Sequence, residues 1–282
     1  MTLFGLSEPV IRLVAFSTIF IALAAIELLA PRLERDEMRG ALKSRRWVTN
    51  LAMVVVSSVA LRIVFPLAAV GTALWAQTNG FGLFPLLGLP LWAAGILAFV
   101  VLDFAVWLEH VVSHKWPLLW RIHRMHHADT GFDLTTALRF HPLEIVLSML
   151  WKAAVIIALG APPVAVLVFE IVLNGAAMFN HANIKLPKAA DAVLRLAIVT
   201  PDMHRIHHST DPRETDSNYG FNLAIWDRMF STYTQTPRLG DTGLEIGLSE
   251  WRDGRSTANL GWALALPFRF PPKARPRPGT DQ

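Results

Sequence analysis

The sequence predicts an all-α integral-membrane protein: a bundle of about four to five membrane helices with a cytoplasmic helical cap that carries a histidine-rich di-metal site. Three observations support this prediction. Of the 282 residues, 53% are hydrophobic and only 17% are charged, and the apolar residues gather in long blocks. The chain also holds ten histidines and no cysteine. Without cysteine there is no disulfide, thiolate metal site or cysteine nucleophile, so a bound metal needs nitrogen or oxygen ligands.

Residues 10 to 112 contain three apolar blocks, which we expect to form membrane helices. The first, residues 10 to 30, would extend about 30 Å as a helix, enough to cross a bilayer. The second, residues 48 to 76, is too long for one crossing, so we expect it to kink or end near Pro66, with Arg62 facing protein or the interface. The third runs through residues 90 to 112.

The basic residues indicate how these helices are oriented. Between the first two blocks lies a loop that the positive-inside rule places in the cytoplasm. The turn after the second block has neither Lys nor Arg. The formal net charge of +4 therefore reflects topology, and we expect no nucleic-acid partner. Docking of an acidic electron donor is a second interpretation of these basic residues, which are Arg32, Arg35, Arg39, Lys43, Arg45, Arg46, Arg121, Arg124 and Arg139.

The rest of the chain is predicted to complete a single membrane domain, residues 1 to 282. A first histidine region covers residues 113 to 142, and residues 143 to 180 are predicted to form a helical hairpin, either tilted across the membrane or re-entrant. Both alternatives return the chain to the same side, which places the second histidine region, residues 181 to 235, beside the first. Residues 189 to 199 are amphipathic and suit the interface. The tail, residues 270 to 282, is expected to be disordered.

The histidines fall into three tight sets and two single residues. The sets are HVVSH at 110 to 114, HRMHH at 123 to 127 and HRIHH at 204 to 208. On a helix, residues spaced three or four apart share a face, so each set presents converging imidazoles. One metal ion accepts about four to six ligands, so this many imidazoles predicts two adjacent ions. Imidazole suits iron, zinc, copper and nickel alike.

These sets resemble the histidine boxes of the fatty acid hydroxylase/sterol desaturase superfamily, whose members are integral-membrane non-haem di-iron enzymes. Further matching segments are RFHPLE (139 to 144), FNHANI (179 to 184), TPDMHRIHHS (200 to 209) and NYGFNLAIWDRMFSTY (218 to 233). The resemblance covers roughly residues 100 to 235. It implies metal binding by His110, His114, His123, His126, His127, His181, His204, His207 and His208, and it makes His141 either a further ligand or a support for the site.

Several acidic residues are candidates for a supporting role. Asp103 lies seven residues before His110 on one helix face and could orient a ligand imidazole, although a pairing with Arg62 or with backbone is equally compatible. Glu170 is either a buried partner of Lys152 or a group that faces the substrate. For Asp202 and Asp211 we favour simple surface solvation over a role at the site.

The resemblance implies O₂-dependent oxidation, by two iron ions, of an unactivated C–H bond in a membrane lipid such as a fatty acyl chain, a sterol or another terpenoid. Hydroxylation is favoured and desaturation stays open. Isolated protein could carry zinc. No cytochrome b5-like domain is recognisable in the chain, so electrons would come from a separate protein of ferredoxin or cytochrome b5 type. The sequence predicts no oligomeric state.

Three other functions remain as alternatives. A metal transporter would hold its ion near the membrane midplane, whereas these histidines lie at helix ends and in polar regions. A bis-histidine haem electron carrier needs isolated histidines on facing helices. A zinc-dependent hydrolase normally has a carboxylate base beside the metal, and the histidine sets contain none.

Overall fold

The regular secondary structure of the described residues is almost all helical, as predicted. The computed structural model describes residues 1–3, 5–33 and 39–272. The described strands are β1 (Thr2–Leu3) and β2 (Leu6–Ser7), which form a short antiparallel hairpin at the N-terminus. The part of the 270–282 tail from residue 273 onward lies outside the described residues.

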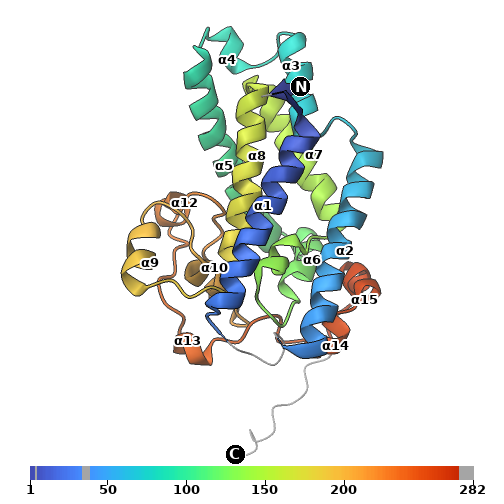
Figure 1. Cartoon of the computed structure of the whole chain (residues 1–282), viewed down its shortest axis with the longest axis vertical. Coiled ribbons are helices and arrows are strands. Elements are labelled where there is room, and N and C mark those ends of the chain that lie inside the picture. The colour runs from blue at the N-terminus through green and yellow to red at the C-terminus, as the bar shows by residue number, and fades with distance from the viewer. Residues whose placement is uncertain (4, 34–38, 273–282) are drawn as a thin grey trace, which may run out of the picture.

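Five long helices run alongside one another and form an elongated bundle (Figure 1). Each is long and apolar enough to cross a membrane. They leave many large apolar side chains exposed around the bundle, as expected where lipid is the solvent. The chain is therefore a multi-pass membrane protein. The helices are α1 (Glu8–Leu29), α2 (Gly40–Val64), α5 (Leu91–Lys115), α7 (Pro142–Leu159) and α8 (Pro163–His181).

The second apolar block breaks where its proline predicts. Helix α2 ends at Val64, and the chain continues through Pro66 into α3 (Ala68–Thr78) and the short α4 (Leu83–Leu86). Proline has no N–H for the helical ladder and its ring clashes with the preceding turn. Arg62 is exposed in the last turn of α2, as expected for a side chain that reaches toward the interface.

The predicted hairpin is formed by α7 and α8, which return the chain to the side that it left. Gly160 ends α7 with a positive φ of 65°, a conformation that favours glycine. A Cβ atom on Gly82, in the turn before α4, would lie 2.0 Å from the backbone nitrogen of Gly160. The two turns can therefore pack this closely only with glycine at residue 82. We call this end of the bundle, with α3 and α4, the far end.

The opposite end, which we call the histidine end, carries the predicted cap of short helices (Figure 1). Of the amphipathic stretch 189 to 199, only the first part is helical, within α9. The cap consists of α6 (Pro117–His127), the 3₁₀ helix η2 (Leu134–Leu138), α9 (Lys188–Leu194), α10 (Pro201–His207), α11 (Pro212–Thr215), α12 (Ile225–Met229), α13 (Gly240–Gly243), α14 (Gly254–Thr257), α15 (Leu260–Ala265) and η3 (Leu266–Phe268).

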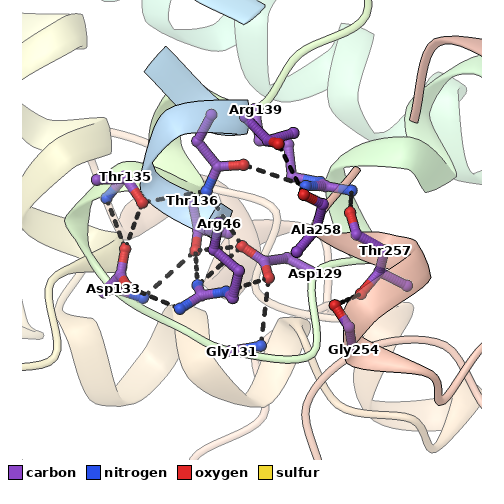
Figure 2. Close-up of polar contacts among 12 residues, drawn as sticks. Arg46, Asp129, Gly131, Asp133, Thr135, Thr136, Arg139, Gly254, Thr257 and Ala258 are labelled. Atoms are coloured by element: carbon purple, nitrogen blue, oxygen red, sulfur yellow. Dashed lines mark hydrogen bonds and ion pairs between the residues drawn. The ribbon is translucent and has the colours of Figure 1, made fainter. Parts of the chain in front are cut away.

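A buried ion-pair network ties α2 to the segment that follows α6 (Figure 2). Arg46 donates two hydrogen bonds to the carboxylate of Asp129, at 2.6 and 2.9 Å, and one to Asp133 at 2.9 Å. Asp133 in turn caps η2 by accepting the backbone N–H of Thr135. A Cβ on Gly131 would lie 2.3 Å from Cζ of Arg46, so the loop can wrap the guanidinium only with glycine there.

The docking interpretation fails for three of the basic residues. Arg46, Arg124 and Arg139 are buried, so none of them can dock a partner. Arg139 donates to the backbone carbonyls of Met125 and Thr257, at 3.0 and 2.7 Å, and to Asn50 at 3.1 Å. Composition alone could not distinguish them, because a buried arginine and an exposed one look the same in a basic cluster.

Candidate metal centre

Two helix ends bring the first two histidine sets together. His110 and His114 lie one turn apart in the last two turns of α5, on one face of that helix. The chain turns at Trp116, and Pro117 begins α6, whose last turns carry His123, His126 and His127. The imidazole side chains of all five histidines are buried.

The other histidines approach from a different part of the bundle. His181 is the last residue of α8, and α10 with its C-terminal cap residue carries His204, His207 and His208. These four side chains are fully buried. The hairpin of α7 and α8 thus brings together His126 and His181, which are 55 residues apart in sequence and whose Nε2 atoms lie 3.2 Å apart.

Nine of the ten histidines form two compact groups. In each group, one ligand atom from every member lies within 4.8 Å of those from all other members. Both HxxHH boxes divide between the groups. In the first box, the first and third histidines belong to the five-histidine group and the second belongs to the four-histidine group. In the second box, the second histidine belongs to the five-histidine group and the first and third belong to the four-histidine group. The five-histidine group is His110, His114, His123, His127 and His207, and the four-histidine group is His126, His181, His204 and His208.

The nitrogen spacing in both groups fits a metal ion. In the five-histidine group, Nε2 of His123 lies 3.1 Å from that of His110 and 3.2 Å from that of His127. In the four-histidine group, Nε2 of His181 lies 3.1 Å from the Nε2 atoms of both His204 and His208. A metal–nitrogen bond of about 2.0–2.1 Å separates neighbouring ligand nitrogens by roughly 2.9–3.4 Å.

Two buried nitrogens support the same conclusion. Nε2 of His114 and Nε2 of His207 have no hydrogen-bond partner among the described residues. A buried polar atom without a partner is destabilising, and such atoms in a native protein call for an explanation. An ion in the five-histidine group would satisfy both, so the donor set suits a nitrogen-ligated metal.

Hydrogen bonds on the opposite ring nitrogen fix how several of these imidazoles are oriented. Nδ1 of His110, His181 and His207 each lies 2.7 Å from a backbone carbonyl, those of Tyr219, Ala177 and Ser217 respectively. A carbonyl oxygen only accepts, so each Nδ1 carries the proton and each Nε2 presents its lone pair. This is the tautomer that a metal requires.

Glu144 orients a fourth imidazole, His123, and the sequence analysis did not assign it this role. Its carboxylate accepts a hydrogen bond from Nδ1 of His123 at 2.5 Å. Glu144 lies in the first turn of α7, three residues after His141. It is the last residue of the RFHPLE segment, so the family resemblance pointed to this position, but it did not indicate that Glu144 contacts His123.

Five of the histidines outside the membrane-spanning segments have lowered pKa values that keep them neutral at physiological pH. Burial, with neighbouring imidazoles, lowers the pKa of His126, His127, His204 and His208 well below the ordinary value. For His207, burial lowers the pKa to about 3, although its bond to the Ser217 carbonyl opposes the shift. Neutral imidazoles are the form that binds metals.

The remaining predicted site residues lie apart from the two groups. His141 caps α7: its Nδ1 accepts the backbone N–H of Leu143 at 3.1 Å, and its Nε2 lies 3.2 Å from the Leu264 carbonyl. Asp103 accepts hydrogen bonds from the Trp226 indole at 2.8 Å and from the backbone N–H of Leu223 at 3.3 Å. Neither partner is a histidine or Arg62, and both lie in or just before α12, so Asp103 anchors the segment around α12.

Of three further acidic residues, Glu170 and Asp211 agree with one of the alternatives given for them, and Asp202 does not. Glu170 pairs with Lys152, at 3.2 Å, and also with Arg12. Asp211 caps α11 near the surface. Asp202 pairs with Arg205 at 2.5 Å and with Arg32 at 3.4 Å, so it is not simply solvated, and neither partner is a histidine.

Comparison with known proteins identifies the family. Residues 95–232 match a family model described as fatty acid hydroxylase, and this segment contains all nine grouped histidines. This segment, just under half of the chain, is thus a fatty acid hydroxylase domain, and the resemblance drawn from the histidine boxes is confirmed. No solved structure matches this chain significantly.

Among the relatives of this chain, the ornithine lipid hydroxylase OlsE of Rhizobium tropici is 30% identical over 173 residues, 61% of this chain and 50% of the relative. The alkylglycerol monooxygenase of Danio rerio is 34% identical over 137 residues, 49% of this chain and 30% of the relative. A cholesterol 25-hydroxylase-like protein of Danio rerio is 29% identical over 144 residues, 50% of this chain and 54% of the relative. The matched segment thus spans about half or less of these relatives.

Proposed function

We propose that this protein is a membrane lipid hydroxylase in which nine histidines hold two iron ions. One observation carries the proposal: the five- and four-histidine groups are buried side by side where membrane helices end, and His110 and His123 also border a cavity between those helices. The names of the relatives, a lipid hydroxylase and a monooxygenase, support the same reaction class.

The reaction inserts one oxygen atom of O₂ into a C–H bond and releases the other as water. It consumes two electrons and two protons, which we assign to a separate donor protein of ferredoxin or cytochrome b5 type. The iron pair, when bound, would supply O₂ activation. Imidazoles alone do not select iron, and zinc binds such ligands well, so zinc-loaded protein is expected to be inactive.

The chain's own residues hold the ions, orient the imidazoles and exclude water. Glu144 and the three backbone carbonyls fix four of the rings. Aromatic rings cover the groups: Phe140 stacks on His126 with ring centroids 4.4 Å apart, and Phe221 lies 5.0 Å from His110. A dry, rigid ligand set favours oxidation of a bound lipid over side reactions with water.

We place the histidine end on the cytoplasmic side. The exposed Arg45 and Lys188 lie at this end. At the far end Arg62 is exposed in the last turn of α2, but the chain from residue 65 to 90 has neither Lys nor Arg. This distribution follows the positive-inside rule.

The test is lipid oxidation by iron-loaded membranes that contain the full chain. Product formation should require O₂ and a reductant and should be lost in His207→Ala. The matched control is His141→Asn, which removes an imidazole outside both groups and keeps a capping side chain for α7; it should retain the activity. Product that forms without O₂, or that persists in His207→Ala, would contradict the proposal.

A further inference from the structure

An apolar groove opens on the side of the bundle next to the five-histidine group. It has a volume of about 310 Å³ and lies between α5, α6 and α7. Several of its side chains are exposed, and two are tryptophans, which favour the membrane interface. Because α5 and α7 are membrane helices, the groove faces lipid. Its apolar walls include Leu108, Val112, Trp116, Leu119, Leu147 and Trp151.

The inner end of this groove joins a smaller cavity of about 160 Å³. Glu109, Ser113 and Glu144 line both spaces, so the two meet at these side chains. The cavity then extends to the ligands His110 and His123. Its volume corresponds to roughly five water molecules of liquid. It can hold one end of a lipid, and the remainder must lie in the groove and the bilayer.

Two carboxylates, Glu109 and Glu144, lie at the junction, and one oxygen of Glu144 receives no hydrogen bond. Oε1 of Glu144 accepts from His123, but its Oε2 is buried and has no hydrogen-bond partner among the described residues. Glu109 accepts from the Ser148 hydroxyl at 3.0 Å through Oε2. The cation that lines the cavity, Lys152, is paired with Glu170. The junction therefore offers acceptors, and an aliphatic chain end would leave them unsatisfied.

We propose that groove and cavity form one lipid-binding site, in which the alkyl chain lies in the groove and a hydrogen-bond-donating polar group of the lipid, O–H or N–H, binds Glu109 and Glu144. The inference rests on the proposed function and assigns its substrate class. The polar group sits beside His110 and His123, so the oxidised C–H bond lies a few bonds from it. Glu109 is then a specificity-determining residue.

The opposite orientation, with the chain end inside and the polar group in the groove, fits less well. It would place hydrocarbon against Glu109, Glu144 and the Lys152 to Glu170 ion pair, and would place a polar group between the apolar walls of the groove. Both placements are unfavourable, because buried polar groups need partners and apolar surface gains by excluding water.

The test is photo-crosslinking of the full chain in membranes, without O₂ or reductant. The probes are a long-chain alcohol and a long-chain primary amine with a diazirine in the chain. Each is paired with a methylated counterpart that lacks the donor, a methyl ether or a trimethylammonium, and the latter keeps the charge. Alcohol or amine should label the peptides that line the groove about tenfold more than its counterpart, the scale of one hydrogen bond to a charged group.

Variants separate the two parts of the site. Leu147→Trp should block labelling of the groove by every probe, whereas Leu150→Trp, which has similar exposure on α7 but does not line the groove, should leave it unchanged. Glu109→Leu should remove the preference for donor probes at full metal content. Glu109→Gln keeps an acceptor without the charge, so it should weaken amine capture more than alcohol capture.

Equal capture of donor and methylated probes, or groove labelling that Leu147→Trp does not reduce, would overturn the inference. An unchanged donor preference in Glu109→Leu would do the same, since the donor would then bind a group other than Glu109. The assay measures binding alone, so its result is independent of oxidation. If membranes oxidise lipid but capture shows no donor preference, the proposed function stands and this inference fails. If capture depends on the donor but no lipid is oxidised, this inference stands and the proposed function fails.

Discussion

At the scale of single residues, the centre depends on the atoms that hold each imidazole from behind. Nδ1 of His123 has a carboxylate as its partner, whereas His110, His181 and His207 use backbone carbonyls. A carboxylate raises the basicity of the imidazole that it orients and also fixes the ring. His123 is also central to its group, because its Nε2 faces those of both His110 and His127.

Replacing Glu144 with Gln should weaken metal binding. The amide oxygen can still accept from Nδ1 of His123, but it lacks the charge, so affinity or activity should fall by about 10-fold to 100-fold. Metal content after dialysis against a graded chelator measures the change. Glu245→Gln, at an exposed site, is the control and should match the unchanged protein. Equal metal retention in both variants would show that Glu144 does not support the centre.

The two groups should respond differently to loss of a ligand. His181→Ala leaves three histidines in the four-histidine group and removes the ring that faces His126, His204 and His208, so about one of two bound ions should be lost. His141→Asn should keep both ions. Metal per chain measured by mass spectrometry decides this, and equal loss in the two variants would mean that the grouping does not describe the ligands.

Of these residue-level features, the sequence predicted the converging histidines but not the groups that orient them. The spacing of the boxes indicated which histidines converge, because helical periodicity is local. The partners behind them were not predictable, since Tyr219 and Glu144 reach His110 and His123 only through the folded chain. His141 illustrates the same limit: it lies near Glu144 in sequence, but its side chain caps a helix instead of facing an ion.

At the scale of elements, the apolar blocks predicted the long helices well, because membrane crossing fixes both length and composition. The contacts between elements were less accessible. The network around Arg46 joins α2 to the loop that leaves His127, and burial alone would raise the pKa of Asp129, but Arg46 and Arg139 hold it well below its ordinary value. The pairing thus keeps a buried carboxylate charged two residues after a predicted metal ligand.

Arg46→Met should destabilise the fold and lower the metal content. It leaves Asp129 and Asp133 buried without their principal cation, and breaking such a pair costs about 3–5 kcal/mol. The neighbouring variant Arg45→Met removes an exposed arginine from the same helix and should change stability by less than about 0.5 kcal/mol. Thermal unfolding in detergent measures both. A similar melting temperature for the two variants would contradict the role given to Arg46.

At the scale of the whole molecule, the bundle brings two distant segments to one end. The alternation of long helices places the cap, both histidine groups and the start of α2 at the histidine end, and places α3 and α4 at the far end (Figure 1). The sequence predicted this return of the chain from the hairpin of α7 and α8, although it did not decide whether the hairpin crosses fully. With 18 and 19 residues, both helices are long enough to cross.

The lack of natural cysteine makes the orientation directly testable. Thr78→Cys, exposed at the far end, should react with a membrane-impermeant thiol reagent on intact cells. Lys188→Cys, exposed at the histidine end, should react only after the membrane is opened. The reverse pattern would place the histidine end outside the cytoplasm.

The central claim is that the five-histidine and four-histidine groups hold the metal ions with which oxygen from O₂ is inserted into a lipid. Incubation of iron-loaded membranes with ¹⁸O₂ and reductant, followed by mass spectrometry of the lipids, tests it most directly. We predict a hydroxylated lipid that carries one ¹⁸O atom, absent from membranes with His207→Ala. A product whose new oxygen comes from water, or one that forms equally in His207→Ala, would contradict the account.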